Sequence, residues 1–157
     1  MTQAAMIAAI YVVLTYIFAP FSFGEVQVRI SEALTILPIF TPAAIPGLFV
    51  GCLIGNILGG AILPDIVFGS IATLIGAFFT WKLREQKPVV ATFPPIISNI
   101  IIVPFVLRYG YGVTLPIPFM MLTVGIGEVL SCGVIGLVLQ SALKNYSHVI
   151  FRDTAKA

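Results

Sequence analysis

Long apolar runs fill almost the whole chain, and only short polar or proline-containing connections separate them. Most runs approach the length of about 20 residues that a helix needs to cross the hydrocarbon core of a membrane. Only 9% of the residues are charged and 59% are hydrophobic, whereas soluble domains carry about 25% charged residues. We therefore predict an all-α, polytopic membrane protein.

Prolines, glycines and charged residues divide the chain into a predicted bundle of six transmembrane helices, of which the second is short. Their ranges are 3–19, 30–40, 43–60, 66–85, 89–107 and 116–143. At about 20 residues per span, no stretch is left for a separate soluble domain. We predict a single membrane domain over residues 1–157. We expect the first run to be a retained helix, because no basic leader precedes it.

The distribution of basic residues predicts the orientation of the bundle. An even number of spans places both termini on one side. If that side is cytoplasmic, six of the eight Lys and Arg residues lie inside: Lys82, Arg84, Lys87, Lys144, Arg152 and Lys156. Arg29 and Arg108 then lie outside, in agreement with the positive-inside rule.

The polar stretch GEVQVRISEAL, residues 24–34, lies between membrane segments, and this orientation places it on the outer side. Ionisable groups among membrane segments are costly and indicate function. Gln27, Arg29 and Glu32 are therefore candidate ligand contacts. An alternative for Arg29 and Glu32 is a mutual ion pair, since they lie three residues apart at a helix start.

Two polar residues lie deep within later helices. Asn99 lies about 13 Å from the outer end near Arg108, and Glu128 lies roughly 15 to 18 Å from the same surface, at 1.5 Å per residue. Both then lie beneath the polar stretch, around a recess open to the outside. A carboxylate at that depth needs a cation, a proton or a ligand donor. Asn99 either bonds a neighbouring helix or binds the ligand, and Asn56 can also point inward.

Small residues mark two helix faces that allow close approach. Four glycines recur at a spacing of four, which predicts a close helix crossing: Gly47, Gly51, Gly55 and Gly59. The first helix carries two pairs at the same spacing, Ala4 with Ala8 and Ala5 with Ala9. The alanine face either packs inside the bundle or docks another subunit.

Several chemistries have no sequence signal. The chain lacks a phosphate-binding G-x-x-x-x-G-K-[ST] loop and the common hydrolase motifs. Cys52 and Cys132 have no metal-ligand spacing and are interpreted as packing residues. We expect no cofactor, no metal and no nucleic-acid partner. Two further hypotheses are a small membrane enzyme acting on a lipid or isoprenoid through Glu32, Asp65 and Glu128, and a purely structural subunit.

The runs VQVRISEALTILPIFTPAAIPGLFVGCLIGN and TQAAMIAAIYVVLT closely resemble the QueT family of membrane proteins. That resemblance implies a six-helix substrate-binding S component of an energy-coupling-factor (ECF) transporter in the cytoplasmic membrane of a bacterium. Such a component is not an enzyme. It captures a queuosine precursor, a 7-deazaguanine base such as preQ1, preQ0 or queuine, and docks on a coupling membrane subunit with two cytoplasmic ATPases.

The resemblance also implies roles for two segments. In the S-component class an alanine motif on the first helix contacts the coupling subunit, and the matching positions here are Ala4, Ala5, Ala8 and Ala9. A long first loop covers the site, which matches residues 21–30. For the substrate, Glu128 or Glu32 can accept the donor edge of the base, Asn99 suits its carbonyl or ring nitrogen, and Phe or Tyr side chains suit its face.

Overall fold

The computed structural model describes residues 1–22 and 28–151, and this part contains helices and connections but no strand. The all-α prediction is thus confirmed. The described residues form eight α-helices, namely α1 (Thr2–Ile17), α2 (Ala19–Ser22), α3 (Ala44–Leu58), α4 (Leu63–Lys82), α5 (Pro88–Phe105), α6 (Ile117–Glu128), α7 (Gly136–Lys144) and α8 (Ser147–Ile150). It also forms a 3-10 helix, η1 (Ile30–Ile39), and two π-helical segments, η2 (Val106–Gly110) and η3 (Val129–Ile135).

Within residues 1–22 and 28–151, three continuous helices are long and apolar enough to cross a membrane. They are α4, α5 with η2, and the run of α6, η3 and α7, with 20, 23 and 28 residues. The other apolar helices, α1, η1 and α3, have 16, 10 and 15 residues. The six-span count and the orientation of the termini therefore stay predictions.

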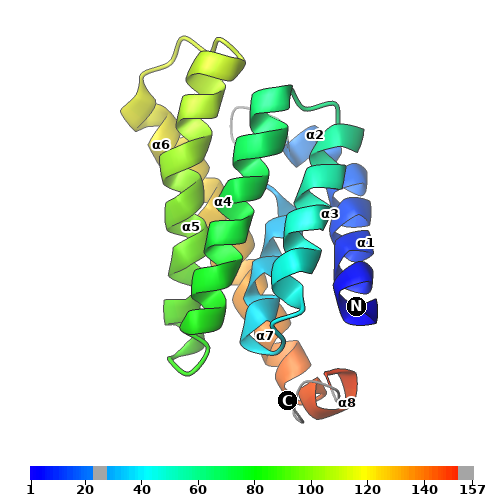
Figure 1. The fold of residues 1–157 in the computed structure, drawn as a ribbon. Coiled ribbons are helices and arrows are strands. Elements are labelled where there is room, and N and C mark those ends of the chain that lie inside the picture. Colours follow the sequence, from blue (N-terminus) through cyan, green and yellow to red (C-terminus); the bar gives the residue numbers. More distant parts are fainter. Residues whose placement is uncertain (23–27, 152–157) are drawn as a thin grey trace.

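The 3-10 helix η1 lies in the middle of the bundle (Figure 1). It contacts α1, α3, α4, α5, η3 and α7. Residues 31–38 of η1 are all buried, and Pro38 lies inside the helix. Because 3-10 helices longer than four residues are uncommon, a central one marks a place where packing or function overrides the preference for an α-helix.

Helices α1 and α3 cross closely, as the glycine spacing predicts. A Cβ at Gly47 would lie 2.7 Å from the carbonyl oxygen of Ala4, and one at Gly51 would lie 3.1 Å from that of Ala8. Glycine is needed at these two positions because the backbone of α1 occupies the space of a side chain.

The two ends of the bundle differ in their connections (Figure 1). The start of α1, the α4–α5 connection and α8 lie at one end, which we call the basic end because the connection carries Lys82, Arg84 and Lys87. The α3–α4 and η2–α6 connections lie at the opposite end. Tyr111, in the η2–α6 connection, lies close to Asp65 at the start of α4.

Candidate functional site

Two buried carboxylates meet in the interior of the bundle, and we call Glu32 and Glu128 the carboxylate pair. One carboxylate oxygen of each glutamate and the Cys132 sulfur all lie within 4.8 Å of one another. The side chains come from η1 and from the last residue of α6, and they are 1% and 3% exposed. The π-helical segment η3 starts directly after Glu128, and such segments occur frequently at functional sites.

Neighbouring helices hold one oxygen of Glu32 in place. The Tyr11 hydroxyl of α1 donates a hydrogen bond to Oε1, and the Thr73 hydroxyl of α4 donates a second one at 3.2 Å. Both donors are buried. The orientation of the Glu32 side chain is therefore fixed through Oε1, which leaves Oε2 for another partner.

Three buried polar atoms near the carboxylate pair lack a hydrogen-bond partner within the described residues. They are Glu32 Oε2, Asn99 Nδ2 and Ser131 Oγ. The Asn99 side chain of α5 lies near enough to both carboxylates for a weak hydrogen-bonding interaction, but no bond of its Nδ2 has ordinary distance and angle. An unsatisfied buried polar group costs about 1 to 3 kcal/mol. Three of them in one place indicate a site for a polar ligand.

The chemistry of the carboxylate pair favours a partner with hydrogen-bond donors or positive charge. Two buried carboxylates at this distance repel each other unless a proton, a cation or a ligand donor lies between them. The Cys132 thiol donates to Glu128 Oε2 at 3.2 Å and satisfies only part of this need. The two carboxylates and the thiol are also the residues that could hold a metal ion.

A second polar group lies near the α3–α4 end of the bundle. Arg29 Nη2 lies 3.4 Å from Asp65 Oδ1, and both side chains are buried. The predicted alternative of an Arg29–Glu32 ion pair is wrong for the described geometry, because the extended backbone at Arg29 precedes η1 and the guanidinium meets Asp65 of α4. Asn56 donates to the Asp65 backbone carbonyl at 3.4 Å. The two groups interact electrostatically, because Arg29 lies close enough to Glu32 for its positive charge to act on that carboxylate.

Tyr111 closes this second group from the η2–α6 connection. Its hydroxyl donates to Asp65 Oδ2 at 2.9 Å and accepts a weaker bond from the Ile62 backbone N–H at 3.4 Å. Burial, and then the neighbouring Asp65 carboxylate, raise the pKa of Tyr111 to about 12. Tyr111 therefore stays protonated and keeps donating at physiological pH.

The structure divides the predicted site residues into these two groups. Glu32, Glu128 and Asn99 lie together around the carboxylate pair, whereas Arg29 and Asn56 lie with Asp65. Gln27, and with it residues 23–27 of the predicted lid, lie outside the described residues.

The sequence interpretation named Asp65 only as a group of the alternative membrane enzyme, and it missed several other residues of the two groups: Tyr11, Thr73, Tyr111, Ser131 and Cys132. Only the last two carry a local signal, because positions three and four residues after Glu128 share its helix face. Cys132 had been interpreted as a packing residue. It is buried as expected, but its thiol contacts both the Glu128 carboxylate and the Glu32 carbonyl.

The alanine face of α1 divides into a buried and an exposed part. Ala4 and Ala8 face the glycines of α3, and Ala8 is 8% exposed. Ala5 and Ala9 lie one position further along, about 100° around the helix, and are exposed. Internal packing therefore accounts for Ala4 and Ala8, and a docking role stays a prediction that rests on Ala5 and Ala9.

Comparison with known proteins supplies a family. The family described as QueT transporter matches residues 1–145. A curated relative, "Queuosine precursor transporter QueT" of Lactococcus lactis subsp. cremoris (strain MG1363), is 34% identical over 73 residues. This alignment covers 45% of the present chain and 43% of the relative, so the chain matches less than half of that protein's length. No solved structure matches the chain.

Proposed function

Since the chain belongs to the QueT transporter family, a family of transporters and not of enzymes, we propose that it is the substrate-capture (S) component of an ECF-type importer. It binds a queuosine precursor, a 7-deazaguanine base such as preQ1, preQ0 or queuine, from the outer side of the cell membrane. A coupling membrane subunit and two cytoplasmic ATPases then drive the delivery of the base across the membrane.

The observation that carries this proposal is that three buried polar atoms at the carboxylate pair have no hydrogen bond of ordinary geometry among the described residues. One is an acceptor, Glu32 Oε2, one is a donor, Asn99 Nδ2, and the third, Ser131 Oγ, can do both. A single flat ligand with adjacent donors and an acceptor on its edge would satisfy all three. Such a cluster has no purpose in a subunit that only assembles with others.

A 7-deazaguanine base has the required edge. Its N1–H and exocyclic amine are adjacent donors that a carboxylate accepts, and its O6 accepts from an amide. We assign the donor edge to Glu32 Oε2, with Glu128 as the second acceptor, and O6 to Asn99 Nδ2. An aminomethyl group on the base carries an ammonium, which can pair with the remaining carboxylate and relieve the repulsion within the pair.

Calorimetric titration of the purified protein with preQ1, preQ0 and queuine tests the site. Glu32→Gln and Glu128→Gln each remove an acceptor of a charge-assisted hydrogen bond, which is worth about 1.5 to 3 kcal/mol, or roughly 10- to 150-fold in Kd. Glu85→Gln is the matched control, because Glu85 is an exposed carboxylate of the α4–α5 connection. Wild-type affinity in both site variants would exclude the carboxylate pair as the binding site.

Docking on the coupling subunit is tested separately. Ala5→Leu and Ala9→Leu place bulk on the exposed part of the alanine face, so we expect them to keep ligand affinity but to lose co-purification with the coupling subunit and the ATPases. Val138→Phe, at an exposed apolar position of α7, is the control. Retention of the partners by both alanine variants would show that this face does not dock them.

A further inference from the structure

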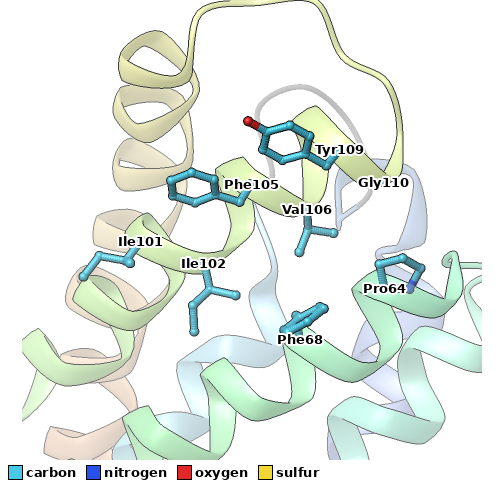
Figure 2. Close-up of a pocket in the computed structure, with 8 residues that line it drawn as sticks. All are labelled: Pro64, Phe68, Ile101, Ile102, Phe105, Val106, Tyr109 and Gly110. Atoms are coloured by element: carbon cyan, nitrogen blue, oxygen red, sulfur yellow. The ribbon is translucent and has the colours of Figure 1, made fainter.

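A groove runs along the face of the bundle formed by α4 and α5, and these two helices lie on the side of the bundle away from α1 (Figure 1). It consists of two hollows of about 760 and 460 Å³ that share Ile101 and Ile102 in their linings. Figure 2 shows the smaller hollow, with Pro64 and Phe68 contributed by α4 and the remaining side chains by α5 and η2. The larger hollow extends from Ile101 toward Lys82 and the basic end.

The lining of the groove suits an apolar chain and excludes a polar solute. Apart from Lys82 and the Tyr109 hydroxyl at the two extremities, its polar side chain is Ser98. The Ser98 hydroxyl already bonds the carbonyl oxygens of Ala72 and Pro95, at 3.0 and 3.1 Å. Between the two extremities, no side-chain donor of the groove wall is thus left for a nucleobase, and the groove is distinct from the carboxylate pair.

The basic end of the groove carries positive charge, which favours an anionic ligand over an apolar partner helix. Lys82 lines the larger hollow, and Lys87 precedes the first turn of α5. Glu85, the acidic residue of this connection, pairs with Arg84 at 3.9 Å, and among the described residues neither lysine forms an ion pair. The first turn of α5 carries no acidic residue, and the positive end of its helix dipole adds to the attraction for an anion.

Aromatic contacts indicate that this end lies at the level of the lipid headgroups. Lys82 Nζ lies 5.1 Å from the centre of the Phe78 ring, and the Arg84 guanidinium lies 4.6 Å from that of Trp81. Tryptophan together with snorkelling basic residues is typical of the membrane–water interface.

From the apolar groove and the two lysines at its end, which form no ion pair among the described residues, we infer that the larger hollow binds one anionic phospholipid, with an acyl chain in the groove and the phosphate between Lys82 and Lys87. This inference does not depend on the identity of the transported solute. The groove lies away from α1, so the lipid stays bound while the alanine face is occupied by a partner.

Trp81 makes the inference testable, because it is the single tryptophan of the chain and is adjacent to Lys82. The full-length protein is reconstituted in phosphatidylcholine nanodiscs with increasing fractions of dibrominated phosphatidylglycerol or, separately, dibrominated phosphatidylcholine. Bromine quenches tryptophan emission at near contact. Each basic residue near the headgroup contributes about a fivefold preference for an anionic lipid, so we expect phosphatidylglycerol to quench at a several-fold lower mole fraction.

Three variants distinguish a specific lipid-binding site from non-specific contact with the bilayer. Lys82→Gln/Lys87→Gln should reduce the preference to near one, and Val90→Phe, which fills the larger hollow, should reduce it without changing any charge. Lys144→Gln, an exposed lysine at the end of α7, should leave it intact. Equal quenching by both lipids in the wild type, or a preference that neither the lysine pair nor Val90→Phe alters, would overturn the inference. Weak quenching by both lipids, with the mass of a dimer, would show that a second copy covers the groove.

Discussion

Gly51→Ala tests whether the crossing of α1 and α3 supports the carboxylate pair. A Cβ at Gly51 would lie 2.8 Å from Tyr11 Cβ and 3.1 Å from the Cα and the carbonyl oxygen of Ala8. Ordinary contacts of a Cβ start at 3.4 Å, so the two helices must separate locally by the difference from 2.8 Å, about 0.6 Å. Because Tyr11 donates to Glu32, this displacement moves the donor that orients the carboxylate.

The expected cost follows from two opposing effects. Overpacking of a close contact costs about 1 to 3 kcal/mol, whereas alanine gains about 1 kcal/mol over glycine in a helix. Gly133→Ala is the matched control, since its Cβ would meet only Val129 Cγ1, at 3.7 Å. The control has the gain without the clash, so its free energy of unfolding should exceed that of Gly51→Ala by about 1 to 3 kcal/mol.

Chemical unfolding in detergent micelles measures the stability difference, and calorimetric titration with the preferred deazaguanine measures the effect on the site. We expect Gly51→Ala to bind several-fold more weakly than the control. If both variants unfolded at the same denaturant concentration and bound with the same affinity, the close α1–α3 contact would not support Glu32, and the reasoning would be refuted.

Three further predictions concern the two polar groups. Asp65→Asn removes the carboxylate charge beside the buried Arg29 guanidinium and should lower the free energy of unfolding by about 3 kcal/mol. The double variant Asp65→Asn/Arg29→Gln should lose less free energy of unfolding than the sum of the two single variants. Additive losses would rule out the ion pair. Tyr11→Phe removes one of the two donors to Glu32 Oε1 and should raise the ligand Kd about tenfold; an unchanged Kd in calorimetry would contradict its orienting role. Because the pKa of Tyr111 is raised from 10.0 to about 12, the stability that its proton contributes is present below pH 10 and is lost as the pH rises toward 12; unfolding of Tyr111→Phe over this range should depend less on pH than unfolding of the wild type.

The features that depend on local sequence alone were predicted correctly. Long apolar runs predicted the all-α fold, and the two quoted runs predicted the family, both of which are confirmed. Glu32, Glu128 and Asn99 drew attention because polar groups are rare in such a chain, and the structure brings them together. Their ligand contacts stay a prediction.

The partners of these residues could not be predicted, because they come from distant helices. Arg29 meets Asp65, 36 positions away in the sequence, and Tyr11 meets Glu32 across 21 positions. Helical periodicity showed that α1 has two small-residue faces, but not which of them would face the glycines of α3. Nor does the pattern of residues 30–40 distinguish a 3-10 helix from an α-helix, since burial among its neighbours decides this geometry.

The shortness of η1 has a consequence for membrane insertion during synthesis. At about 2.0 Å per residue, its ten residues reach roughly 20 Å, less than the hydrocarbon thickness of about 30 Å. The backbone carbonyls at the end of η1 and the Glu32 side chain therefore cannot be exposed to lipid. They must be covered by α4, η3 and α7, which contact η1 and which the ribosome makes later. A nascent chain that stops before residue 128 lacks η3 and α7 as neighbours of η1, so we expect such truncated products to be substrates for membrane quality-control proteases.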